Sequence, residues 1–113
     1  MKEGDIVLTP MPQADGKVKN RPAIYLREMP PFRDALVCGV STQTHQLALD
    51  FDELITSQDS DFPASGLVSD SLIRLGFLAV LPRRNIIGSI GSISPERHMR
   101  LLHRLSEYLV KAP

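Results

Sequence analysis

Proline and glycine divide most of the chain into short apolar runs, and only the last segment carries the spacing of a helix. The runs are rich in valine, isoleucine and leucine, have the length of strands and are separated by turn-forming residues. A proline pair at positions 30 and 31 forbids a helix between two of them. The expected strands cover residues 5–9, 22–26, 35–40, 46–51, 72–81 and 85–92.

The C-terminal segment predicts a helix. Ser94 is a good N-cap residue, Pro95 fits the first helical position, and Glu96 complements the positive end of the helix dipole. Apolar side chains then recur at helical spacing from Met99 to Leu109. The acidic segment 52–66 predicts a surface excursion, with one helical turn at residues 52–57.

The length of 113 residues is that of one domain, so we expect residues 1–113 to form a single domain. Tryptophan is absent and aromatic residues are few, so the core must be mainly aliphatic. Five or six short strands, a long first loop over residues 10–20 and one terminal helix predict a mainly β fold. We expect a small, strongly bent antiparallel sheet or a partly closed barrel, with the helix against one side.

Charge is distributed unevenly although its formal sum is zero. Residues 34–73 contain aspartate and glutamate but no lysine or arginine, whereas cations outnumber anions in both flanking segments. The two ends of the chain could therefore form a basic face that suits a polyanionic ligand. Alternatively, folding mixes the charges over a solvated surface, and the pattern has no functional meaning.

Several classes of protein are excluded by absent patterns. The N-terminus lacks the pattern of a signal peptide, and no segment approaches the ~18 apolar residues of a membrane span, so we expect a cytoplasmic protein without membrane contact. Phosphate-loop, dinucleotide-binding, zinc-protease and paired-cysteine motifs are missing. His98 and His103 are five residues apart, so they cannot share the helix face that metal ligands need. We expect no metal and no cofactor, and a buried Cys38.

Asn20-Arg21-Pro22 is the first candidate for a binding function. Proline restricts Arg21 to extended conformations, so the side chain leaves the start of a strand on a stiffened backbone. A guanidinium held in this way can grip a phosphate with two hydrogen bonds. The alternative is an ordinary surface arginine near a turn.

Residues 41–45 are the second candidate. Ser41, Thr42, Gln43 and His45 supply hydroxyls, an amide and an imidazole at the end of an apolar strand. Alone, such a cluster is often only turn chemistry. If this strand end lies beside Arg21, the combined set could clasp a phosphodiester.

The chain resembles the PemK/MazF family of growth-inhibiting toxins over nearly its whole length. The resemblance rests on the order and spacing of short motifs, which are Gly4-Asp5-Ile6-Val7, Arg21-Pro22-Ala23, Ser41-Thr42-Gln43, Asp70-Ser71-Leu72-Ile73, Ile87-Gly88 and Ser94-Pro95-Glu96. It implies an SH3-like barrel, a homodimer and a cognate antitoxin that blocks the RNA groove. It also implies metal-independent, sequence-specific cleavage of single-stranded RNA, in which the 2′-hydroxyl attacks and leaves 2′,3′-cyclic phosphate and 5′-hydroxyl ends.

The resemblance also assigns roles to residues. The family's arginine falls on Arg21, and its catalytic hydroxyl falls on Ser41, where the family usually has threonine. Thr42 is the alternative if the register is shifted by one, and alternation along a strand predicts that only one of the two faces the site. Arg21 should stabilise the phosphorane, because it is a poor base at neutral pH.

Other residues are expected to hold RNA around the scissile bond. The loop at residues 12–19 would place Lys17 and Lys19 on phosphates, with Asn20, Gln43 and His45 as further contacts. His45 is also a minor candidate for the general base. Two rival functions remain: an inactive barrel that binds a protein partner, and, less favoured without tryptophan, a gyrase-targeting toxin of the same fold.

Overall fold

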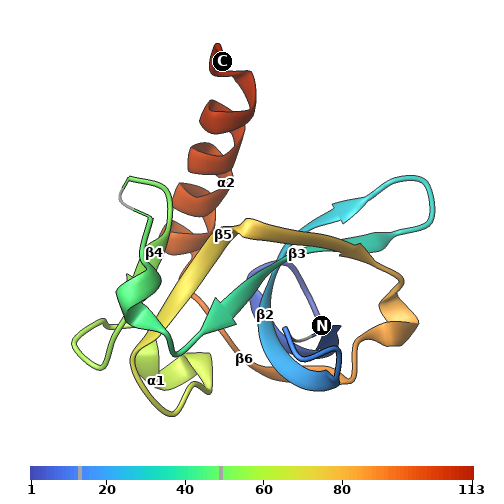
Figure 1. Ribbon diagram of the computed structural model, residues 1–113, viewed down its shortest axis with the longest axis horizontal. Coiled ribbons are helices and arrows are strands. Elements are labelled where there is room, and N and C mark those ends of the chain that lie inside the picture. The colour runs from blue at the N-terminus through green and yellow to red at the C-terminus, as the bar shows by residue number, and fades with distance from the viewer. Residues whose placement is uncertain (13, 49) are drawn as a thin grey trace.

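Antiparallel strands form one curled sheet within residues 1–12, 14–48 and 50–113, the part of the chain that this computed structural model describes (Figure 1). The strand order in the sheet is β4-β5-β3-β2-β1-β6. The strands are β1 Asp5–Pro12, β2 Val18–Met29, β3 Asp34–Ser41, β4 Glu53–Ile55, β5 Ser71–Leu81 and β6 Gly88–Ser92. The helices are α1 Phe62–Ser65 and α2 Pro95–Val110, with 3₁₀ turns at Thr44–Gln46 and Arg83–Asn85. The predicted mainly β fold with a C-terminal helix is confirmed.

The first loop is shorter than predicted. β1 and β2 stay paired as far as Pro12 opposite Val18, so much of the expected loop belongs to a hairpin. The Asp15-Gly16 turn signal does lie at its tip, where the Asp15 carboxylate accepts the backbone N–H of Lys17 at 3.0 Å. Gln13 lies outside the described residues.

The predicted strand at residues 46–51 and the predicted helical turn at 52–57 are both wrong in the described chain. Residues 44–46 form a 3₁₀ turn, and the strand of this region is β4, at Glu53–Ile55. The Asp52 carboxylate accepts the backbone N–H groups of Ala48 and Leu75, both at 3.0 Å. These bonds hold a turn against β5. The turn forms in place of the strand that the alternation of apolar and polar residues had predicted. Leu49 lies outside the described residues.

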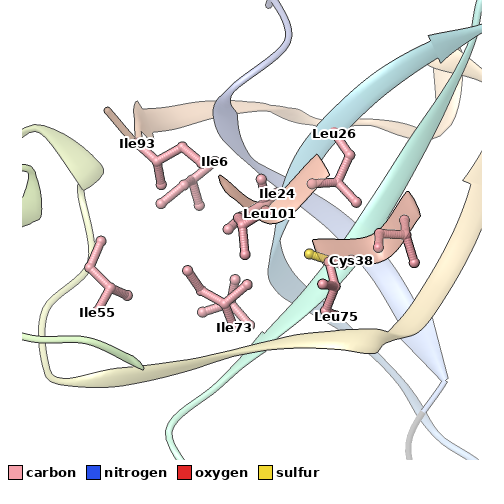
Figure 2. Packing of buried hydrophobic residues seen from close by; sticks show 11 residues of the cluster. Ile6, Ile24, Leu26, Cys38, Ile55, Ile73, Leu75, Ile93 and Leu101 are labelled. Carbon is pink, nitrogen blue, oxygen red and sulfur yellow. The ribbon is translucent and has the colours of Figure 1, made fainter. Parts of the chain in front are cut away.

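The main core is aliphatic, as predicted. Figure 2 shows that its side chains come from the strands of the sheet, from α2 and from the connection between β6 and α2, and they include Ile6, Ile24, Leu26, Cys38, Ile55, Ile73, Leu75, Ile93 and Leu101. Cys38 is fully buried, and burial raises the pKa of its thiol to about 12. The thiol is therefore protonated at neutral pH and acts as a core side chain.

The short helix α1 packs against β6. Gly91 makes this close approach possible, because a Cβ there would lie 2.3 Å from the backbone oxygen of Ala64. The space beside Gly88, in contrast, is open. α1 therefore packs against the β6 edge of the curled sheet.

Helix α2 begins as predicted: the Ser94 hydroxyl accepts the backbone N–H of Arg97 at 3.1 Å. The helix packs on the core through Leu101 and Leu105. Its last turns project beyond the sheet (Figure 1), and Tyr108, Leu109 and Val110 are exposed there. Among the described helices, none combines the length and hydropathy needed to cross a membrane.

The acidic middle of the chain packs against the cations of α2. Arg97 donates to Asp61 through Nε at 2.8 Å and Nη2 at 3.1 Å, and its guanidinium also lies 3.3 Å from Glu53 and from Asp59. Arg100 forms an ion pair with Glu53 as well. Folding thus mixes the charges in this region, so these helix cations do not join a separate basic face.

Candidate active site

A pocket opens where strands β2 and β3 separate. Their ladder ends at Ala23 opposite Gly39, although β2 extends back to Val18 and β3 continues to Ser41. From there β2 pairs only with β1, while β3 stays paired with β5 as far as Ser41 opposite Leu72. Pro22 has no N–H to donate to a further rung. A cavity of about 960 Å³ lies at this divergence.

The lining combines two cations with hydroxyls, amides and an apolar wall. Its polar members are Arg21, Ser41, Thr42, Gln43, Gln46, Ser69, Ser71 and Arg74. Its other members are Met11, Ala14, Pro22, Gly39, Val40, Leu67, Val68 and Phe77. The residues come from β1, β2, β3 and β5, from the turn between β1 and β2, and from the segments that follow β3 and α1.

Half of the predicted site residues meet in this pocket. Arg21, Ser41, Thr42 and Gln43 line it together, as the two sequence features had suggested for neighbouring strand ends. Continuing the β2–β3 register beyond its last pair would bring Arg21 opposite Ser41. The structure therefore joins the two candidate features into one site.

The other predicted contacts lie outside the lining. Lys17 lies in the turn between β1 and β2, and Lys19 and Asn20 lie at the start of β2, opposite Met11 and Pro10. His45 lies in the 3₁₀ turn after β3. All four predicted residues are exposed, and they lie on segments next to the pocket.

Ser41 and Thr42 both line the pocket, contrary to the expectation that only one would. β3 ends at Ser41 and the chain bends at Thr42, so the alternation of side chains along a strand does not extend to this pair. The Ser41 hydroxyl accepts the backbone N–H of Gln43 at 3.0 Å. It keeps its own hydrogen for a ligand, because a hydroxyl both accepts and donates.

Arg74 and Phe77 are the lining residues that the sequence prediction missed. The β3–β5 register shifts between Cys38 opposite Leu78 and Gly39 opposite Arg74, so residues 75–77 have no partners on β3. Side chains three apart on a regular strand point to opposite faces. Here the Arg74 guanidinium carbon is 5.6 Å from the centre of the Phe77 ring. Gly76, within the apolar run, was the signal for such a bulge.

The pocket is electropositive. Arg21 and Arg74 both line it, and none of the described residues in its lining is aspartate or glutamate. Both arginines are charged at any physiological pH. Nowhere among the described residues do three His, Cys, Asp or Glu side chains gather as metal ligands would. The arrangement suits an anion that accepts several hydrogen bonds.

Comparison with known proteins agrees with this chemistry. A family model described as PemK-like, MazF-like toxin of type II toxin–antitoxin system matches residues 2–109. The chain belongs to this family. A type II toxin has an antitoxin partner, and PemK/MazF toxins are generally endoribonucleases. No curated protein matches the chain of this PemK/MazF toxin.

Proposed function

We propose that this PemK/MazF toxin is a sequence-specific endoribonuclease that cuts single-stranded RNA in the pocket between β2 and β3. The observation that carries the proposal is the lining itself: two arginines and several hydroxyls without a described carboxylate. A phosphodiester offers negative charge and several acceptor oxygens to these donors. The cavity also has room for nucleotides on both sides of one phosphate.

The RNA supplies its own nucleophile in this proposal. The 2′-hydroxyl oxygen bonds to the adjacent phosphorus while the bond from phosphorus to the 5′-oxygen breaks. The proton of the 2′-hydroxyl passes to a base, and the departing 5′-oxygen takes up a proton. The products are a 2′,3′-cyclic phosphate and a 5′-hydroxyl, and the reaction, as the family resemblance implies, needs no metal ion.

The chain's own groups stabilise the charge that develops in this step. Arg21 and Arg74 face the pentacoordinate phosphorus from β2 and β5, and the Ser41 and Thr42 hydroxyls donate to its free oxygens. Arginine is too weak a base at neutral pH to take the first proton. His45, on the turn that follows β3, is our candidate for this base, because imidazole has suitable chemistry.

RNA extends beyond the pocket in both directions. Lys17, Lys19 and Asn20 are exposed beside the start of β2, where they meet the flanking phosphates, and Gln43 lines the pocket within reach of a base edge. We place the cognate antitoxin over this groove, so that it excludes RNA, and expect the working form to be a homodimer.

One observation favours a second function, in which the barrel binds a protein partner and is a weak enzyme. The resemblance assigns the family's threonine position to Ser41, whose hydroxyl already accepts a turn hydrogen bond. Serine also lacks the methyl group that fixes the threonine rotamer. A poorly oriented donor would lower the rate without removing the groove.

Cleavage of mixed-sequence RNA in EDTA separates the two functions. We expect the purified protein to release 5′-hydroxyl ends at one short sequence, and Arg21→Ala and Arg74→Ala each to lower the rate about 10²- to 10³-fold. Arg27→Ala is the matched control, because Arg27 is an exposed β2 arginine outside the lining. No cutting by the native protein, with RNA binding retained, would favour the binding module.

A further inference from the structure

The Phe77 ring is an exposed aromatic surface inside a pocket whose other described lining residues are charged, polar or aliphatic. Its side chain is 41% exposed although it lies in a strand of the central sheet. An aromatic ring of this size normally contributes by burial, so its exposure here leaves apolar area without a partner. The anion-binding role of the arginines does not explain why this ring is exposed in the pocket.

The local fold holds this ring in the pocket. The unpaired residues 75–77 of β5 bring Phe77 to the same side as Arg74. Gly39 on β3 leaves room for it, because a Cβ at that position would lie 2.8 Å from Cδ1 of the ring. Two departures from a regular strand pair, a bulge and a glycine, thus combine at one side chain.

The surroundings of the ring fit a flat heteroaromatic partner. Leu67 and Val68 line the same pocket, and Val68 is 97% exposed. A volume of about 960 Å³ is much larger than a phosphate group needs. Arg74 lies over the ring, which keeps a guanidinium beside whatever stacks there.

We propose that Phe77 is a stacking platform for one unpaired base of the RNA, next to the phosphate held by Arg21 and Arg74. This inference rests on the proposed function and assigns the apolar part of the pocket to the base. Phe77 is then a binding and specificity-determining residue, whereas the arginines and hydroxyls act on the phosphate. Stacking on an aromatic side chain contributes substantially for each base in single-stranded complexes.

The absence of tryptophan from the chain allows a direct test of stacking. Phe77→Trp places a sole indole on the platform, and a mixed-sequence oligodeoxynucleotide serves as a probe that cannot be cut because it lacks the 2′-hydroxyl. We expect binding to quench the indole fluorescence. The matched control is Phe32→Trp, since Phe32 is 80% exposed in the β2–β3 connection, at the other end of β3 from Ser41; its emission should change little.

Cleavage tests the role in specificity. Phe77→Leu keeps an apolar side chain but removes the ring, so we expect kcat/KM to fall about tenfold and the base preference at one position of the cut site to weaken. Phe77→Tyr keeps the ring and should retain both. Gly39→Ala, which displaces the ring, should resemble Phe77→Leu. Unchanged urea midpoints would show that the variants remain folded.

Failure of this inference is distinguishable from failure of the proposed function. Unaltered cutting by Phe77→Leu, with no quenching in Phe77→Trp, overturns the stacking platform and leaves the endoribonuclease intact. Equal quenching in Phe32→Trp also overturns it. If the native protein neither cuts RNA nor binds the probe, both proposals are wrong.

Discussion

The arginine in the core of the α2 interface and the arginines of the pocket have opposite surroundings. The Arg97 side chain is 6% exposed, and its guanidinium contacts Asp61 at 2.8 Å and Glu53 and Asp59 at 3.3 Å. Arg21 and Arg74 line a cavity in which no described lining residue is acidic. Arginine is thus surrounded by carboxylates in the α2 interface, whereas in the pocket it shares a lining with hydroxyls, amides and apolar side chains.

The pKa shifts show that Arg97 and Asp61 stabilise each other's charged forms. Burial lowers the pKa of Arg97, but the hydrogen bond and charge of Asp61, with Glu53 and Asp59, outweigh it and raise that pKa overall. The Arg97 hydrogen bonds in turn lower the pKa of Asp61. This cation therefore stabilises the fold, because both partners remain charged at neutral pH.

Arg97→Met should have the largest effect on stability. The substitution leaves the buried Asp61 carboxylate without its cation and removes one of the cations around Glu53, so we expect the free energy of unfolding to fall by about 3–5 kcal/mol. Urea denaturation followed by circular dichroism measures it. Arg74→Met is the control and should change stability by less than ~1 kcal/mol, because the guanidinium of this partly exposed pocket arginine contacts the Phe77 ring and not a buried carboxylate. Equal losses in the two variants would contradict the division between a structural and a functional arginine.

Salt concentration should affect the function of the pocket arginines, which we expect to bind phosphates. In the pocket, binding of single-stranded nucleic acid should weaken as salt rises, and Arg74→Gln should lower the slope of log affinity against log salt by about 0.7 for one lost phosphate contact. Titration of an oligodeoxynucleotide at several salt concentrations measures this slope. The control is Arg84→Gln, because Arg84 is exposed but outside the lining. A slope unchanged by Arg74→Gln would show that Arg74 does not contact a phosphate.

The elements that follow from local pattern were predictable from the sequence. The α2 N-cap, the strands on either side of Pro30-Pro31 and the buried Cys38 were each predicted from a few neighbouring residues, and the structure confirms them. The joint site of Arg21 and Ser41 was also suggested in advance. It depends on two adjacent strands, and adjacency of consecutive strands is the commonest arrangement in sheets.

The parts that were missed depend on contacts between distant residues. The turn around Asp52 is held by its bond to Leu75, and the position of Phe77 depends on Gly39 of another strand. Arg97 and Asp61 are 36 positions apart, so their pairing was not visible in a charge pattern. Such contacts form only when the whole chain packs, so they cannot be predicted from the pattern of a single segment.

Asp61→Asn should reduce the loss of folding stability that occurs as the pH falls. The folded-state pKa of Asp61 is depressed, so its contribution is present above the ordinary pKa of about 3.9 and is lost as pH falls through the folded value. At pH 7 we expect Asp61→Asn to be less stable by about 2 kcal/mol, because a charged hydrogen bond is lost. The gap should narrow below about pH 4.

Urea denaturation at steps from pH 7 to pH 2.5 measures the difference in the free energy of unfolding between the native protein and Asp61→Asn. Other carboxylates titrate in both proteins, so the difference between the two curves isolates Asp61. A gap that stays constant over the whole range would mean that the Asp61 charge is not what Arg97 binds in the folded state.

Arg100→Met should have the smallest effect. Arg100 pairs with Glu53, as Arg97 does, but its side chain is 46% exposed, so water already screens its charge. An exposed ion pair contributes about 0–1 kcal/mol, and less at high salt, whereas the loss in Arg97→Met should hardly depend on salt. Urea denaturation of both variants at low and high salt measures the two losses. The comparison is direct because both arginines pair with the Glu53 carboxylate. If Arg100→Met costs as much as Arg97→Met, burial is not what separates a structural arginine from a surface one in this fold, and the contrast with the pocket loses its physical basis.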